Sequence, residues 1–255
     1  MIYIAKMGVE LEGGWRHRKD RESGFHGDSS VDVYSEDDGR HECDGDCEDD
    51  CVISSEPRIA GEFVSPPSTV KELVEFIDKH YPDDIDESCG MHVHFSFVKE
   101  GHYGTLMEPR FYGYFLRMMQ KFGEEHELSK SDEFWKRLAG KNNYCCNNRK
   151  SNRTSVGYRR LVESQVYDRT RNETRYHHLN FCKALHGTLE VRLLPMFNDK
   201  KLAIEAIHYL AWIIESYLAK RKRNKVFKKE LFYEEQEPHI SSSEIDLGKE
   251  LICAS

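Results

Sequence analysis

The chain has 255 residues, of which 38% are hydrophobic and 32% are charged, and its formal net charge is −8. This length suits one large domain or two small ones and leaves room for a sizeable core. No apolar run approaches the roughly 18 residues of a transmembrane helix, and the N-terminal residues lack the apolar stretch of a signal peptide. We therefore expect a cytoplasmic protein that does not enter a membrane.

Five of the eight cysteines are scattered, which indicates reduced thiols rather than a secreted disulfide framework. The other three follow a histidine in an acidic stretch: His41, Cys43, Cys47 and Cys51. This set could hold a structural Zn²⁺ ion through three thiolates and an imidazole. Because the spacing differs from a Cys-x-x-Cys knuckle, a reduced or disulfide-linked surface loop remains the alternative.

The charges are unevenly distributed. Residues 28–56 hold twelve acidic residues and one basic residue, whereas residues 136–175 hold eleven basic and three acidic ones. Tyrosines interleave the basic segment, as in some nucleic-acid-binding proteins. The negative net charge argues against nucleic acid, and ATP or an anionic peptide explains the basic segment equally well.

The first half of the chain reads as strands around one helix. We expect a strand over residues 2–12, a connecting loop over 13–27, a short strand over 31–34, an acidic excursion to about 56 and a strand over 58–64. Ser65-Pro66-Pro67 ends that last strand. A capping box, Thr69-Val-Lys-Glu72, starts a helix that stops before Pro82, and residues 90–98 form the next strand.

The second half is predicted to be mainly helical. Pro109 opens a long helix with an apolar stripe of Phe111, Phe115, Met118 and Phe122. We expect a shorter helix over about 131–139, a polar segment with one helix over 140–175, a strand over 188–194 and a strong helix capped by Asp199. The basic run Lys220–Lys229 suits a solvated helix end, and the last 25 residues suit a polar tail.

Three of these strands pair an apolar face with a face of charged or ligating side chains. The polar positions are Glu10 and Glu12 in the first, His92, His94 and Ser96 in the second, and Thr188, Glu190 and Arg192 in the third. In one sheet they would gather three carboxylates, two imidazoles and a guanidinium on one face. Such carboxylates repel each other unless a cation lies among them, so the pattern predicts a metal-dependent site.

Each of these residues also has a plainer explanation. The two glutamates could lie on a solvated strand face, and the two histidines could be hydrogen-bonded core residues. A His-x-His strand also occurs in cupins, with Glu100 as a third ligand, but Glu100 lies beyond the apparent strand end. Glu62 could pair with a nearby base, and Arg192 could form a structural salt bridge.

Four motifs occur in order between about residues 7 and 195: Gly8-Val-Glu-Leu-Glu12, Gly61-Glu-Phe-Val-Ser-Pro-Pro67, Cys89-Gly-Met-His-Val-His94 and Gly187-Thr-Leu-Glu-Val-Arg192. Together they resemble the amidoligase family, in the glutamine synthetase and glutamate–cysteine ligase superfamily of carboxylate–amine ligases. Arg175-Tyr-His-His-Leu-Asn180 also fits. Asp28-Ser-Ser departs from the usual Asp-Gly-Ser, and the cysteine-containing linker at 35–57 is unlike the family's compact loop.

The resemblance implies an α+β, glutamine synthetase-like catalytic domain over residues 1–220, with a curved, mainly antiparallel sheet and helices packed on one face. Residues 35–57 would be an insertion and 221–255 a basic, polar extension. It also implies an ATP-dependent ligase that forms an amide through an acyl-phosphate, with small-molecule or peptide carboxylates and amines as substrates. Substrate specificity would lie in the loops at 13–57 and 100–175.

The resemblance implies roles for individual residues. Mg²⁺ or Mn²⁺ would be held by Glu10, Glu12, Glu62, His92, His94 and Glu190. The catalytic residues would be Glu10, Glu62 and Arg192, and the nucleotide or acyl-phosphate contacts Arg175, Asn180 and Arg192. Two alternatives remain: a non-catalytic nucleotide- or peptide-binding protein on the same scaffold, and a metal-dependent hydrolase or oxygenase that uses the His-x-His pair. The motifs leave the oligomeric state open.

Overall fold

The computed structural model describes residues 1–15, 23–27, 31, 59–142, 145–146, 155–167, 176–181 and 188–230. The elements in chain order are β1 (Ile4–Trp15), β2 (Phe25–His26), β3 (Ile59–Val64), α1 (Val70–His80), β4 (Gly90–Phe97), α2 (Glu100–Leu106), α3 (Pro109–Glu125), α4 (Glu133–Leu138), α5 (Ser155–Tyr167), β5 (Leu179–Asn180), β6 (Leu189–Pro195) and α7 (Lys200–Glu230).

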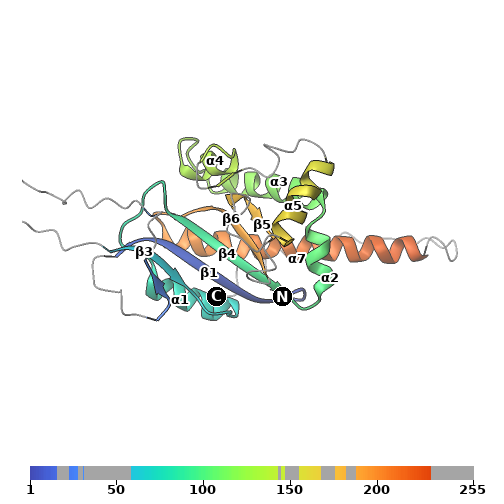
Figure 1. The fold of residues 1–255 in the computed structure, drawn as a ribbon, viewed down its shortest axis with the longest axis horizontal. Coiled ribbons are helices and arrows are strands. Elements are labelled where there is room, and N and C mark those ends of the chain that lie inside the picture. The colour runs from blue at the N-terminus through green and yellow to red at the C-terminus, as the bar shows by residue number, and fades with distance from the viewer. Residues whose placement is uncertain are drawn as a thin grey trace, which may run out of the picture.

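The strands form one six-stranded sheet in the order β2-β3-β1-β4-β6-β5, and each pair of neighbours is antiparallel. Figure 1 shows β1 and β4 crossing the molecule side by side, with α7 behind them. The expected α+β class with a mainly antiparallel sheet is confirmed. Glu100 lies in α2, after the end of β4, as the sequence predicts.

The strands alternate between two faces because successive side chains of a strand point to opposite sides. In the β1–β4 pair, Val9 lies opposite Val93 and Leu11 opposite Met91, and all four side chains are buried. The alternate positions carry the polar residues. Opposite residues of an antiparallel pair share a face, so one face of the sheet is apolar and the other is polar.

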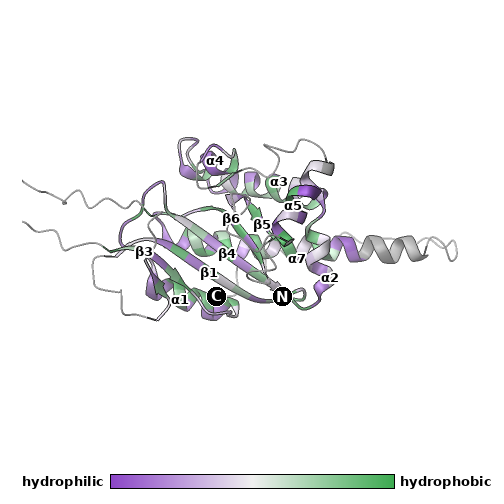
Figure 2. Ribbon diagram, viewed as in Figure 1, coloured by the Kyte–Doolittle hydropathy of each residue, from purple (hydrophilic) through white to green (hydrophobic). Residues whose placement is uncertain are grey.

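Helices α1, α3 and α7 contribute many of the remaining core residues, and α2, α4 and α5 contribute others. Thr69 caps α1 through the predicted capping box, and Asp199 accepts a hydrogen bond from the Lys201 N–H at the start of α7. In α3 the predicted stripe is buried at its phenylalanines, but Met119 takes the buried place expected for Met118. Figure 2 shows apolar residues of α7 where this helix passes behind the sheet.

Helix α7 runs across the expected domain boundary between residues 220 and 221 without interruption. By length and composition its Lys200–Lys222 part is the one described helix that could cross a membrane, and half of the tested stretch is buried inside the protein. A core helix of a soluble protein has the same features. The buried face contacts the core through residues such as Ile207, Leu210 and Ile214.

The prediction of a loop over residues 13–27 is wrong at both ends. Strand β1 continues to Trp15, and Phe25 and His26 form β2. Gly13 lies so close to Pro82 that a Cβ at residue 13 would be 2.4 Å from the proline Cβ. The glycine here permits a close approach between a strand and its neighbour rather than marking a turn.

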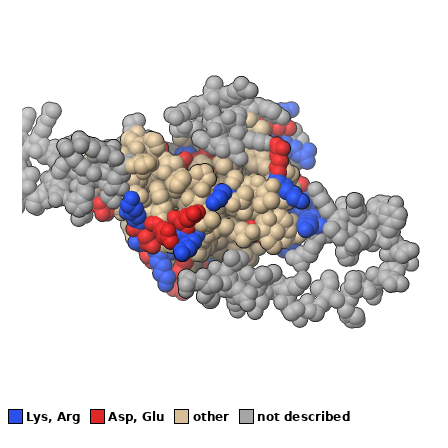
Figure 3. Space-filling model, turned by 90° about the horizontal axis from the view of Figure 1, so that it is seen from below, with Lys and Arg blue, Asp and Glu red and all other residues tan. Residues whose placement is uncertain are grey.

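Figure 3 shows acidic and basic side chains side by side on the face viewed. Exposed ion pairs such as Lys71–Glu75 and Lys200–Asp78 contribute little stability. Of the strand expected over 31–34, only Val31 is described, and it is buried. The acidic excursion, the expected zinc set and the polar tail lie outside the described residues.

Candidate metal site

The predicted polar residues form a row across four strands. Glu10 of β1 lies opposite His92 of β4, and His94 lies opposite Glu190 of β6. Glu190 in turn lies opposite Asn180 of β5. The antiparallel registers therefore bring together side chains that are up to 180 positions apart in the sequence, as the alternation of each strand predicts.

Three residues of this row converge on one point. Among the described residues, Glu10, His94 and Glu190 each offer a ligand atom within 4.8 Å of the others. His94 Nε2 lies 2.9 Å from Glu10 Oε1, and His94 Nδ1 lies 3.2 Å from Thr188 Oγ1. A hydroxyl on the second ring nitrogen is the arrangement that fixes the orientation of a metal-binding histidine.

His92 lies between two carboxylates. Its Nδ1 is 3.0 Å from Glu10 Oε2, and its Nε2 is 3.5 Å from Glu12 Oε1. The other oxygen of Glu12 accepts a hydrogen bond from the Gly90 N–H at 2.6 Å. His92 is 2% exposed and both of its nitrogens are engaged, so it positions Glu10 and Glu12. The triad of ligand atoms forms without it.

Glu190 is held on both oxygens. Arg192 Nη1 donates to Oε1 at 2.5 Å, and Asn180 Nδ2 donates to Oε2 at 2.6 Å. Asn180 Oδ1 and Arg192 Nε are buried without a hydrogen-bond partner in the described structure. The Arg192 guanidinium also lies 5.5 Å from the centre of the Tyr176 ring. The Arg192 Nε–H donor and the Asn180 Oδ1 acceptor, both beside Glu190, therefore make no hydrogen bond within the described structure.

Glu10 and Glu190 are held in their charged form, because nearby groups lower the pKa of each carboxyl. Burial alone raises the pKa of Glu10, but hydrogen bonds and charges from His92 and His94 outweigh it, and the pKa lies well below 4.5. Burial also opposes the charged form of Glu190, yet Arg192 and His94 lower its pKa.

The negative charges of Glu10 and Glu190 stabilise the protonated, cationic form of His94. Burial lowers the pKa of His94, but the hydrogen bond to Glu10 and the charges of Glu190 and Glu10 raise it above its ordinary value. Burial likewise disfavours the charged form of Arg192, and nearby glutamates raise its pKa. A site that stabilises positive charge in this way is suited to a metal ion.

The donor set fits a divalent ion. Two carboxylates and one imidazole offer oxygen and nitrogen ligands without a thiolate, a set that suits Mn²⁺, accommodates Mg²⁺ and also occurs around Zn²⁺. The outer contacts of Thr188, Asn180 and Arg192 hold the ligands in place. The residues present therefore fit the metal that the sequence predicts.

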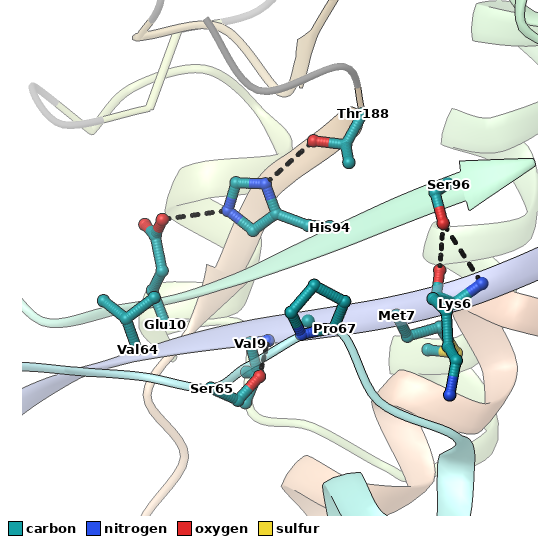
Figure 4. Close-up of a pocket in the computed structure, with 11 residues that line it drawn as sticks. Lys6, Met7, Val9, Glu10, Val64, Ser65, Pro67, His94, Ser96 and Thr188 are labelled. Carbon is teal, nitrogen blue, oxygen red and sulfur yellow. Dashed lines mark hydrogen bonds and ion pairs between the residues drawn. The ribbon is translucent and has the colours of Figure 1, made fainter. Parts of the chain in front are cut away.

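A pocket of about 500 Å³ opens beside the triad. It is lined by Lys6, Met7, Gly8, Val9, Glu10, Val64, Ser65, Pro67, His94, Ser96 and Thr188. Figure 4 shows Glu10, His94 and Thr188 together at one end, and Lys6 and Ser96 at the other. A ligand in this pocket would lie within reach of the proposed metal.

Comparison with protein-family models, with curated proteins and with solved structures finds no match in any of the three.

The remaining predicted residues stand as follows. Glu62 of β3 lies opposite Glu12, on the polar face, but outside the triad of ligand atoms. Arg175 lies outside the described residues. Gly8 and Lys6 were not among the predicted site residues, and Thr188 was predicted only as a polar position of its strand, without a role in the site. Thr188 and Lys6 occupy the same alternating positions as Glu190 and Glu10, so the period of two already carried a signal for them.

Proposed function

We propose that the protein is an ATP-dependent ligase that joins a carboxylate to an amine, on a glutamine synthetase-like α+β fold. The observation that carries this proposal is the convergence of Glu10, His94 and Glu190 from three strands. These residues belong to three of the four motifs that resemble the amidoligase family. The antiparallel sheet supports the proposal because it places the motifs on one face.

In the proposed reaction a substrate carboxylate attacks the γ-phosphorus of ATP, forming an acyl-phosphate and releasing ADP. An amine then attacks the acyl carbon, phosphate leaves, and the amine loses a proton as the amide forms. When bound at Glu10, His94 and Glu190, a divalent ion would neutralise phosphate oxygens during this transfer. The acyl-phosphate makes the carboxylate oxygen a good leaving group.

The protein's own residues would prepare this chemistry. His92 and His94 keep Glu10 ionised, so the carboxylate is ready to bind a cation. Arg192 holds Glu190, and its buried Nε–H has no partner among the described residues, so it could donate to a phosphate or acyl-phosphate oxygen. Asn180 fixes the second oxygen of Glu190. Catalysis of phosphoryl transfer depends mainly on such positioning and on charge.

Trapping with hydroxylamine tests the proposal without knowledge of the amine. The protein is incubated with ATP, Mg²⁺, hydroxylamine and mixtures of amino acids, dicarboxylates or peptides. We expect ADP and a hydroxamate in equal amounts, and loss of both in Glu10→Gln. Glu75→Gln is the matched control, because Glu75 is exposed on α1 and belongs neither to the triad nor to the pocket lining. If no mixture yields ADP although MgATP binds, the protein is a binding module.

The alternatives predict different results. A hydrolase or oxygenase using the His-x-His pair would act without ATP, and it would need His92 and His94 as paired ligands. In the structure His92 instead bridges Glu10 and Glu12. We place the ligase in the cytoplasm, where the free thiols of Cys89, Cys145 and Cys146 would stay reduced. A Zn²⁺ ion at His41, Cys43, Cys47 and Cys51 stays a proposal that metal analysis can test.

A further inference from the structure

The pocket beside the triad has opposite chemistry at its two ends. Lys6, Gly8 and Glu10 alternate on one face of β1, so their side-chain positions line the pocket in sequence. Glu10 belongs to the proposed metal site. The Lys6 Cα lies roughly 13 Å along the strand from the Glu10 Cα, from about 3.3 Å per residue, and the Lys6 side chain ends in an ammonium group. Pro67 borders the pocket between these ends, and Val64 lies opposite Glu10.

The Lys6 ammonium is available to a ligand. It lies 3.9 Å from Glu72 Oε2, and the Lys6 side chain is 46% exposed, so this ion pair is weak. The same Glu72 oxygen already accepts hydrogen bonds from the Thr69 N–H at 2.7 Å and the Thr69 hydroxyl at 2.8 Å. Because Glu72 is already hydrogen-bonded in the capping box of α1, losing its ion pair with Lys6 costs little stability when Lys6 binds another anion.

Gly8 lines the pocket between its Lys6 end and its Glu10 end. It lies opposite His94, and a Cβ at residue 8 would be 3.6 Å from Ser65 Oγ and 3.7 Å from His94 Cβ. These are ordinary contact distances, so the fold tolerates a side chain at this position. The absence of a side chain therefore leaves open space between Lys6 and Glu10 rather than relieving a clash.

We infer that this pocket holds a small, elongated ligand with two anionic groups, one at the metal bound by Glu10 and His94 and the other at Lys6. The inference rests on the proposed function, because the metal provides the first anchor. Two ligands share this chemistry: a phosphate chain such as that of the nucleotide, and a dicarboxylate substrate. The separation of the two anchors selects an extended ligand, and its middle part would lie beside Gly8 and Pro67.

The test measures metal and ligand separately in the full-length protein. Electron paramagnetic resonance follows the binding of Mn²⁺ alone, and calorimetry in excess Mg²⁺ follows magnesium tripolyphosphate and, separately, glutarate. The variants are Lys6→Ala, Lys6→Arg and Gly8→Val, with Gly8→Ala as a smaller change if the valine variant does not fold. The controls are Lys71→Ala, at a lysine that is 88% exposed, and Gly104→Ala, at a glycine with open space around it.

We expect Mn²⁺ to bind all variants alike. At least one probe should bind the wild type, lose about tenfold in affinity in Lys6→Ala and regain most of it in Lys6→Arg. Gly8→Val should abolish its binding, and the controls should match the wild type. Dependence on Lys6 and Gly8 for tripolyphosphate identifies the phosphate chain, and dependence for glutarate identifies the dicarboxylate.

Two results overturn the inference. If Mn²⁺ binds but neither probe depends on Lys6 and Gly8, or neither binds the wild type, the pocket is not the ligand compartment and the proposed metal site still stands. If Mn²⁺ does not bind the wild type, the proposed function fails and this inference fails with it.

Discussion

Glu10 Oε1 and His94 Nε2 lie 2.9 Å apart, although 84 residues separate the two side chains in the sequence. In the β1–β4 register His94 lies opposite Gly8, not opposite Glu10. The contact is therefore a diagonal one, in which the imidazole reaches from its place opposite Gly8 to the carboxylate of Glu10.

The Glu190–Arg192 pair stabilises the fold as well as the site. Glu190 is 4% exposed, and Arg192→Met would leave its charge buried without its guanidinium partner. We expect this change to lower the free energy of unfolding by about 3 kcal/mol, the range for breaking a buried pair. Urea unfolding measures the effect. The double variant Glu190→Gln, Arg192→Met should recover part of the loss; a loss equal to the sum of the single changes would contradict the pairing.

Gly90 leaves room for the side chains of His92, Glu12 and Arg137 beside the proposed metal site. A Cβ at residue 90 would lie 2.9 Å from His92 Nε2 and 3.0 Å from both Glu12 Oε2 and Arg137 Nη1. We expect Gly90→Ala to displace His92 and Glu12 and thereby weaken Mn²⁺ binding at Glu10, which His92 positions. Mn²⁺ titration of Gly90→Ala against the Gly104→Ala control checks this. Unchanged Mn²⁺ affinity would show that His92 does not position the ligands.

His178 makes stability depend on pH. Burial and the charges of His177 and Arg137 lower its pKa from 6.5 to about 4, outweighing the hydrogen bond between Nε2 and the Arg137 carbonyl. Below pH 6.5 the unfolded chain binds a proton that the folded protein does not. The contribution is therefore complete above pH 6.5 and is lost as the pH falls to about 4, up to about 3 kcal/mol.

The His178→Gln variant isolates this contribution, because the other titrating groups remain. We expect the difference in unfolding free energy between wild type and variant to shrink as the pH falls from 6.5 to about 4. Urea unfolding at several pH values measures it. A difference that stays constant across this range would mean that His178 is not buried in its neutral form.

Gly123 and Gly104 should respond in opposite directions to the same substitution. A Cβ at Gly123 in α3 would be 2.6 Å from Phe134 Cε1 and 2.8 Å from Trp135 Cζ2 of α4. We expect Gly123→Ala to cost about 1–2 kcal/mol, since overpacking exceeds the gain in helix propensity. Gly104→Ala in α2 meets no atom within 4 Å and should stabilise by up to about 1 kcal/mol. Thermal unfolding of both variants checks the signs.

The alternation of hydrophobic and polar residues was sufficient to place the main site residues on one face. A period of two fixes which side chains share a face, so Glu10, His94, Glu190 and Arg192 could be identified before any pairing was known. The same period includes Lys6 and Thr188. Their part in the pocket was not predicted because it depends on neighbouring strands, and the strand register is not visible in one sequence.

Other features could not be read from local patterns. Arg137 of α4 is fully buried, and its Nη2 donates to the carbonyls of residues 87–89, just before β4. Hydrophobic periodicity does not predict such a contact between a helix and a distant turn. Gly13 was misread because a glycine in a turn and a glycine at a close packing contact look alike in sequence. Strand β5 has two residues and is defined only by its pairing with β6.

The most direct test of the account is a calorimetric titration of ATP into the purified protein, with and without Mg²⁺, for wild type, Glu10→Gln and the control Glu75→Gln. The account predicts magnesium-dependent binding that Glu75→Gln retains and Glu10→Gln weakens at least tenfold, since Glu10 contributes a charged ligand to the metal. Binding of equal strength in Glu10→Gln, or no binding by the wild type in either condition, would contradict a metal and nucleotide site on the three-strand face.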